Sequence, residues 1–243
     1  MGIEINRPLG VSGLNTAFVP KYRPYFGVQQ NTDTFERTSI DRFTSENAIR
    51  KMISASPKVQ QIIREINAST LNMNELNAML KTHAANTTAA ALGIADNLPF
   101  ALAQKTNKQA LKDAAYLHDL GKVLIPPEVL NKPGIHNDKE AKIMHRHSEL
   151  SYELLKTTNI APYTLDLIKN HHNYDKADLN QQILIAADKY SALTEKRVYK
   201  EAIPPKQALT IIYQDVKDGK LHPFVFKALV DYAKQNTNKV SMV

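Results

Sequence analysis

From residue 44 onward, apolar residues recur every three to four positions in one segment after another. No segment alternates apolar and polar residues as a half-buried strand does. The clearest example is the stretch 72–96, in which Leu76, Leu80 and His83 would share one stripe of a long helix. No fixed-period repeat or low-complexity tract interrupts the pattern. These observations predict an all-α fold, with one helical domain over residues 44–243.

Residues at the expected helix ends support this interpretation. Thr44 or Ser45 can cap a first helix, because a short side-chain oxygen accepts a hydrogen bond from the backbone N–H groups at a helix start. Pro57 fits the first turn of the next helix, where its missing N–H has no partner to lose. Asn137 and Glu140 have the spacing of a capping box at the start of a later helix.

The first 43 residues differ from the rest of the chain. They contain Pro8, Pro20 and Pro24, several glycines and no sustained helical period, which predicts an extended or partly disordered lead segment. Its aromatic side chains would let residues 1–43 contact the helical domain or a protein partner. The segment lacks the apolar stretch of a secretory signal, and no run approaches the roughly 18 apolar residues of a membrane span. We therefore expect a cytoplasmic protein.

Composition narrows the chemistry available to the chain. There is no cysteine, which excludes disulfides, thiolate metal sites and thiol catalysis, so any metal must be held by His, Asp, Glu or water. The net charge of +7 comes from basic residues interleaved with acidic ones, and no nucleic-acid-binding motif is present. This surplus fits either a mildly basic surface or a positive cleft for an anionic ligand such as a phosphate ester.

Imidazole and carboxylate side chains occur within or at the ends of several expected helices. The stretch "KDAAYLHDLGKVLIPPEVLNKPG" puts His118 beside Asp119 at a helix end that Gly121 is expected to terminate, and Lys122 follows. A second carboxylate, Asp188, falls in the middle of the apolar helix "ILIAADKYSAL", where burial is costly without a partner. Four more histidines lie in expected helices or at their ends: His83, His147, His171 and His172.

Each of these residues has an ordinary explanation when taken alone. A single helical histidine is usually hydrogen-bonded, and Asp188 could pair with Lys189 or Arg197. Together, five histidines and two aspartates on helices that can converge favour one metal site. Histidine and carboxylate without sulfur suit Mn, Fe, Zn, Co or Ni, and suit Mg less well. The other histidines are expected at surface or capping positions: His136, His145 and His222.

The stretch around His118 resembles the signature of the HD-domain metal-dependent phosphohydrolases. It is most similar to the HD-GYP subgroup, whose pattern is roughly HD-x-GK-x-x-IP followed by a Lys-Pro-Gly turn. The similarity continues through "MHRHSELSYELL", "IKNHH" and "AADKYSALTEKRVYKEAIPPKQAL", and covers about residues 70–235. The resemblance implies a helical HD-type bundle, a bacterial origin and phosphodiesterase activity on a cyclic dinucleotide such as cyclic di-GMP.

Carried over position by position, the resemblance implies a binuclear metal site. The ligands of one divalent ion would be His83, His118, Asp119 and Asp188. Asp119 would bridge to a second ion, held also by His147 and His171. Three-metal members have a glutamate one turn before the first histidine, where this chain has Met79; Glu75 lies a further turn away. We therefore expect two ions, with His172 beside them as an additional ligand or a substrate contact.

The resemblance also implies roles in the reaction. A binuclear site supplies an activated water near neutral pH and binds the phosphoryl oxygens. Lys122 and Arg197 match positions that face the phosphate, where Lys122 would offset the charge of the transition state. His172 would protonate the leaving alcohol. The expected catalytic residues are thus Asp119, Lys122 and His172.

The subgroup's Gly-Tyr-Pro loop has no counterpart in this sequence. The chain reads "HHNYDKADLNQQILIAAD" up to Asp188, and Asn173 takes the place of the usual glutamate. The substrate could therefore be cyclic di-GMP, another cyclic dinucleotide, a linear dinucleotide or a nucleotide phosphomonoester. The alternative from another class is a catalytically inactive helical binding or signalling module. A homodimer is left open.

Overall fold

The structure is a computed structural model that describes residues 42–196 and 201–240, without the side chains of 237–240. The chain divides into two units, 1–39 and 40–243, and the description below concerns the second unit alone. Arg197 and nearly all of the expected lead segment 1–43 lie outside the described residues. The interpretations of both therefore stay predictions.

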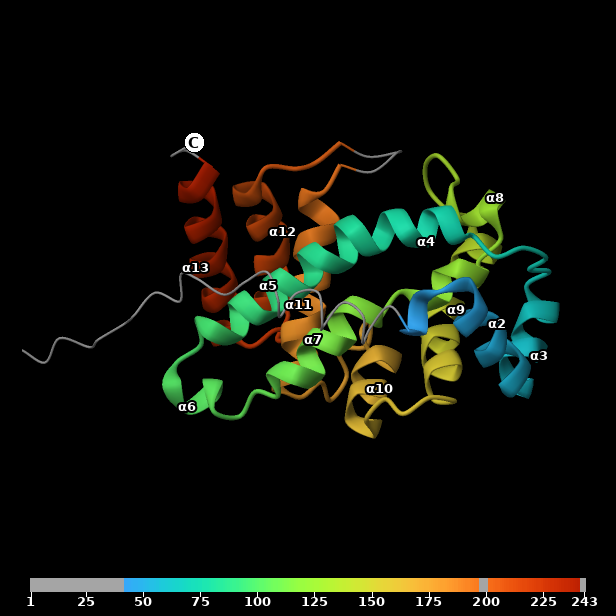
Figure 1. The fold of residues 1–243 in the computed structure, drawn as a ribbon. Helices are drawn as coiled ribbons and strands as arrows, with labels where there is room; N and C mark the ends of the chain where they lie inside the picture. Colours follow the sequence, from blue (N-terminus) through green and yellow to red (C-terminus); the bar gives the residue numbers. More distant parts are fainter. Residues whose placement is uncertain (1–41, 197–200, 241–243) are drawn as a thin grey trace, which may run out of the picture. The chain divides into compact units, whose positions relative to one another are not determined.

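The described residues form helices and no strands, which confirms the all-α prediction (Figure 1). In chain order the α-helices are α2 (Glu46–Ala55), α3 (Pro57–Glu65), α4 (Met73–Met79), α5 (Ala85–Asp96), α6 (Phe100–Ala103), α7 (Lys108–Leu117), α8 (Pro127–Leu130), α9 (Asp138–Leu155), α10 (Pro162–Lys169), α11 (Leu179–Thr194), α12 (Pro205–Lys217) and α13 (Pro223–Val240). Two elements have another pitch, the π-helix η1 (Leu80–Ala84) and the 3₁₀-helix η2 (Leu120–Leu124). None of the helices described is both long and apolar enough to cross a bilayer.

The helix starts lie where the sequence places them. The Ser45 side chain accepts a hydrogen bond from the Ala48 N–H at 3.3 Å and caps α2, and Pro57 opens α3. Asn137 and Glu140 form the expected capping box at α9, each side chain accepting from the other residue's backbone N–H. Side-chain caps therefore fix where α2 and α9 begin.

Helix α5 is central to the packing of this unit. It packs against α7, α11 and α13, and α10 packs against both α7 and α9 (Figure 1). The contact with α13 is close, because a Cβ at Gly93 would overlap the ring of Tyr232. Among the largest fully buried side chains are Ile94, Leu111, Leu117, Leu150 and Leu154. This apolar core holds together the helices that carry the histidines and aspartates.

The long helix expected over 72–96 contains a change of pitch. It runs as α4, then as the π-helix η1, and then as α5, with His83 inside the π segment. A π-turn fits one extra residue into a helix, and such turns are frequent at functional sites. The long helix is therefore present with Leu76, Leu80 and His83 all buried, but its pitch is not uniform at His83.

Gly121 does not end a helix, contrary to the sequence-based expectation. α7 ends at Leu117, and Gly121 lies within η2. The Gly121 N–H donates to Ser151 Oγ at 2.8 Å, and a Cβ on Gly121 would overlap the carbonyl oxygen of His147. Glycine is needed here because η2 lies directly on the backbone of α9, and not because the chain turns with a positive φ.

Candidate metal centre

The structure brings all seven predicted ligand residues into one cluster. His83 comes from η1, His118 and Asp119 from the end of α7, His147 from α9, His171 and His172 from the end of α10, and Asp188 from α11. Neighbouring imidazole rings in this cluster lie between 4.0 and 5.4 Å apart, measured between ring centroids. Side chains that are far apart in the sequence thus meet at one point.

Asp119 lies between two groups of histidines and is only 2% exposed. Its Oδ2 atom is 3.3 Å from His118 Nε2 and 3.5 Å from His83 Nε2. Its Oδ1 atom is 3.3 Å from His147 Nε2 and 3.9 Å from His171 Nε2. Each carboxylate oxygen therefore faces a different pair of imidazoles, which is the arrangement of a carboxylate that can bridge two cations.

Asp188 completes one of these groups. Its Oδ1 atom is 3.0 Å from His83 Nε2 and 3.6 Å from His118 Nε2. The ordinary pairing of Asp188 with Lys189 was wrong, because Lys189 Nζ lies 2.6 Å from Asp215 Oδ2 on α12 instead. The largely buried Asp188, with 14% of its side chain exposed, is thus compensated by imidazoles and not by a lysine.

Backbone carbonyls orient three of the histidines. The Nδ1 atoms of His118, His147 and His171 each face the carbonyl oxygen three residues earlier, at 2.9, 2.6 and 2.6 Å. A carbonyl can only accept, so each Nδ1 carries the proton and Nε2 points into the cluster. His83 differs, because its Nδ1 lies 3.1 Å from Glu195 Oε2.

The charges divide the cluster into two halves. Burial lowers the pKa of His118, but the negative charges of the adjacent Asp119 and Asp188 outweigh it and raise this pKa to about 10. Burial lowers the pKa of His147 to about 3 and that of His171 well below its usual range. Without a metal, His118 is therefore protonated near neutral pH, whereas His147 and His171 are neutral.

The polar atoms inside the cluster fit a cation. His118 Nε2 and Asp119 Oδ1 are buried without a hydrogen-bond partner. His147 Nε2 lies 3.2 Å from His171 Nε2, although both neutral rings carry their proton on Nδ1. Two lone pairs then face each other, and a divalent ion would relieve this repulsion.

Three sets of side chains in the described residues could each hold a metal ion. They are His83 with His118 and Asp188, His147 with His171 and His172, and His118 with Asp119 and His171. The first two sets share no residue, and Asp119 lies between them. The donor atoms are nitrogen and oxygen only, which suits a divalent first-row metal.

Two cavities reach the cluster. One of about 550 Å³ is lined by Lys122, Met79, His83 and Glu195, among others. Lys122 Nζ also lies 2.6 Å from Asp119 Oδ2, so this ammonium connects the cavity to the cluster. The other, of about 540 Å³, is lined by His172, whose side chain is 46% exposed. The interior of the cluster is thus accessible from the surface.

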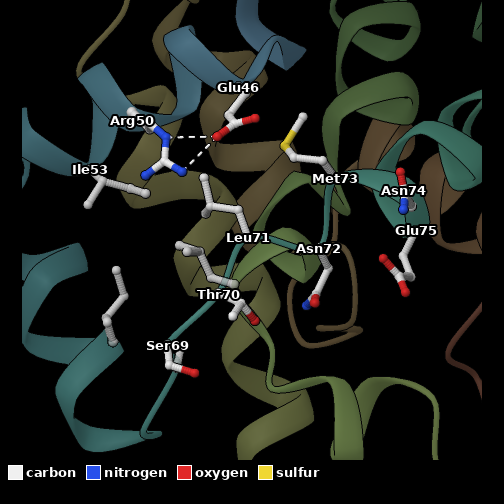
Figure 2. A pocket seen from close by; sticks show the side chains of 13 residues that line it. Glu46, Arg50, Ile53, Ser69, Thr70, Leu71, Asn72, Met73, Asn74 and Glu75 are labelled. Atoms are coloured by element: carbon white, nitrogen blue, oxygen red, sulfur yellow. Dashed lines mark hydrogen bonds and ion pairs between the residues drawn. The ribbon is translucent and has the colours of Figure 1, made fainter.

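The cavity drawn in Figure 2 lies away from the histidines. It measures about 520 Å³ and is bounded by α2, the α3–α4 connection and the start of α4. Arg50 pairs with Glu46 at 2.6 Å on its edge. It shares only Glu75 with the 550 Å³ cavity, and it contains none of the residues of the cluster.

The histidines without an expected role lie apart from the cluster. His145 and His222 are exposed, and His222 Nδ1 accepts from the Phe224 N–H at the start of α13. His136 Nε2 lies 2.9 Å from the Val129 carbonyl oxygen. Sequence reasoning missed Glu195, although its position seven residues after Asp188 was a usable signal for a shared helix face.

Comparisons with known proteins agree with this geometry. Residues 80–193 match the HD domain family model. The cyclic di-GMP phosphodiesterase response regulator RpfG of Xanthomonas campestris pv. campestris is 36% identical over 114 residues, which cover 41% of this chain and 30% of that protein. The 3′3′-cGAMP-specific phosphodiesterase 1 of Vibrio cholerae is 29% identical over 140 residues, which cover 53% of this chain and 32% of that protein.

Two further matches extend the picture. A cyclic di-GMP phosphodiesterase of Thermotoga maritima is 31% identical over 140 residues, which cover 51% of this chain and 38% of that protein. The HD domain of the L. monocytogenes phosphodiesterase PgpH superposes with a TM-score of 0.51 at 19% identity, covering 68% of this chain and 98% of that one, and shows the same fold. The matched stretch spans about a third of the length of the curated relatives. Residues 80–193 of this chain therefore match the HD-domain family in sequence, and the described helices have the fold of a solved HD domain.

Proposed function

We propose that this chain is a metal-dependent phosphodiesterase that hydrolyses a cyclic dinucleotide. The observation that carries the proposal is Asp119, whose two oxygens face two separate pairs of buried imidazoles. Such a carboxylate suits a pair of cations, and a pair of cations suits phosphoryl chemistry. The HD-domain relatives named as cyclic di-GMP and 3′3′-cGAMP phosphodiesterases support the choice of substrate class.

The proposal assigns two divalent ions to the cluster. The first would be held by His83, His118, Asp119 and Asp188. The second would be held by Asp119, His147 and His171, with His172 beside it. Two ions, and not three, are supported by Met79 on the wall of the cavity next to His83 and by the absence of Glu75 from every metal-capable set among the described residues.

Mn, Fe, Zn, Co and Ni fit these ligands better than Mg, because imidazole nitrogens outnumber carboxylates. When bound, the ions would supply Lewis acidity that lowers the pKa of a water and neutralises the phosphoryl oxygens.

Side chains of the protein would stabilise the charge on the phosphate and protonate the leaving group. Lys122 places an ammonium between Asp119 and the 550 Å³ cavity, where it can offset negative charge that grows on a phosphate. His172 is the most exposed histidine of the cluster, so it can exchange a proton with water and donate that proton to the leaving oxygen. Arg197, outside the described residues, is proposed as a second phosphate contact.

We also propose that residues 44–243 form one HD-type domain, with the metal-site core at about 70–235. Helices α2 and α3 precede the stretch matched by the family model. Both pack against α9, which carries His147. Their contacts support counting them with the domain and not as a separate one.

The first test is the metal content per chain, measured by elemental analysis of protein purified without chelator. Wild type should hold about two first-row metals, and Asp119→Ala should lose most of both, because each ion depends on one of its oxygens. Asp113→Ala is the matched control, since it removes a carboxylate on α7 that is paired with Gln109 and not with the cluster. Metal loss in both variants would contradict the assignment.

Hydrolysis is then measured with cyclic di-GMP, 3′3′-cGAMP, a linear dinucleotide and a nucleotide phosphomonoester. Cleavage of a cyclic dinucleotide that depends on Asp119 supports the proposal. Cleavage of the phosphomonoester alone would make the chain a phosphomonoesterase. If the protein binds metal but hydrolyses none of these substrates, the enzyme hypothesis is wrong and the chain is a catalytically inactive binding module.

A further inference from the structure

We propose that Glu195 is a positioning residue that holds His83 in the orientation and tautomer required for metal binding. The inference rests on the metal-dependent function proposed above. Glu195 Oε2 lies 3.1 Å from His83 Nδ1, across 112 residues of sequence. A carboxylate can only accept at this contact, so His83 carries its proton on Nδ1 and turns Nε2 toward Asp119 and Asp188.

The π-helix explains why His83 needs this partner. His118, His147 and His171 each use the backbone carbonyl three residues earlier to hold Nδ1. His83 lies inside η1, where the backbone hydrogen bonds follow the π pattern, and its Nδ1 meets a side chain from another helix instead. Three of the histidines thus have a nearby backbone carbonyl as the partner of Nδ1, whereas His83 has the carboxylate of Glu195, 112 residues away.

One helix supplies the contacts on both sides of the ring. Asp188, within α11, places Oδ1 3.0 Å from His83 Nε2. Glu195, directly after α11 and seven residues beyond Asp188, meets Nδ1. Seven residues correspond to about two helical turns, so both side chains project from the same face of α11. The imidazole of His83 therefore lies between a carboxylate within α11 and a carboxylate at the C-terminal end of this helix.

Glu195 is itself held in place. Its Oε1 atom accepts a hydrogen bond of 2.7 Å from Asn86 Nδ2, one turn after His83. Its backbone N–H donates to the Ser191 carbonyl oxygen at 3.0 Å, and its side chain is only 12% exposed. The contacts with Asn86 and with the end of α11 consequently orient the Glu195 carboxylate toward His83.

A carboxylate partner should strengthen His83 as a ligand. An imidazole that donates Nδ1–H to a carboxylate is a more basic ligand at Nε2, and loss of such a partner typically lowers metal affinity 10–100-fold. His147 and His171 have carbonyl partners and do not depend on Glu195. The effect should therefore be confined to the ion held by His83, His118 and Asp188.

The test is a titration of metal-free protein with Co²⁺ or Mn²⁺ in competition with a chelator. We expect Glu195→Ala to weaken one of the two bound ions by about 10–100-fold and to leave the other unchanged. Asn86→Ala keeps the carboxylate but loosens it, and should weaken the same ion by a smaller factor. Glu201→Gln is the matched control, because Glu201 is exposed and pairs with Lys196.

Two outcomes would overturn the inference. One is unchanged affinity for both ions in Glu195→Ala, and the other is equal weakening of both ions, which would point to general loosening of the fold. If Glu195→Ala does not fold, Glu195→Gln and Asn86→Ala carry the test. The proposed function fails separately, when wild-type protein binds metal but cleaves no phosphodiester.

Discussion

Gly121 and His147 are in backbone contact: a Cβ on Gly121 would overlap the His147 carbonyl oxygen. The neighbouring Ser151 hydroxyl joins the two, accepting from the Gly121 N–H and donating to the same carbonyl, each at 2.8 Å. The glycine next to the His118–Asp119 pair therefore sets the distance between η2 and the helix that carries His147.

We predict that Gly121→Ala destabilises the protein by about 1–3 kcal/mol and lowers its metal content, because η2 and α9 must move apart. Chemical denaturation and elemental analysis check the two effects. Gly134→Ala is the comparison: it meets no atom within 4 Å but has a φ of +99°, so it should cost stability without loss of metal. Equal metal content in both variants would contradict the prediction.

The two aspartates should differ in how many ions they control. Asp188 lies within 3.6 Å of His83 and His118 and 4.0 Å from His172, whereas Asp119 lies 3.3 Å from a histidine on each side. Asp188→Asn is thus expected to lose about one ion per chain, and Asp119→Asn about two. Elemental analysis after equal dialysis distinguishes them. A loss of both ions in Asp188→Asn would mean that the sites fill together.

Metal binding should release protons. The pKa of His118 is raised to about 10, and hydrogen bonds to Asp188 and Glu195 raise that of His83 against the opposing effect of burial. The ring of His118 is therefore protonated near pH 7.5 in the metal-free protein, whereas His147 and His171 are already neutral. Filling the site should displace at least one proton per chain, that of His118.

Calorimetric titrations in buffers of different ionisation enthalpy measure this release. Because protons compete with the ion, metal affinity should rise with pH until the pH passes the pKa of His118 at about 10. If the heat of binding is the same in every buffer, no proton is released, and His118 is not protonated in the metal-free protein.

Lys122 should matter for turnover more than for metal binding. Its ammonium lies 2.6 Å from Asp119 Oδ2 and lines the 550 Å³ cavity. Lys122→Gln is expected to keep the metal content and to lower kcat/KM by about 10²–10³-fold, the usual loss when one group that stabilises transition-state charge is removed. Lys132→Gln, which breaks a lysine–Glu140 pair outside the cluster, is the control and should leave kcat/KM unchanged.

Much of the fold and of the cluster could be predicted from the sequence. Ser45 and the Asn137–Glu140 box are local signals that fix a helix start by hydrogen bonds within a few residues, and Pro57 suits the start of α3 because it has no backbone N–H to leave unpaired. The grouping of the histidines was also predictable, because buried imidazoles and carboxylates need partners and the chain has few other candidates.

Other features depend on contacts between distant segments. The partner of His83 is Glu195, 112 residues away, and helical periodicity does not show which side chain will face which. Asp215 captures Lys189 from another helix, which removes the simplest local partner of Asp188. The role of Gly121 likewise depends on how closely α9 approaches, and this distance is set by the whole core.

The π segment between α4 and α5 makes chain length a requirement at this point. Because a π-turn absorbs one extra residue, removing one residue from Leu80–Ala84 would restore ordinary α pitch and leave α4 and α5 in register. The turn that carries His83 would then tighten, and His83 would leave its place between Asp188 and Glu195. Substitutions on the exposed side of this segment can be tolerated, but a single-residue deletion would dismantle the site.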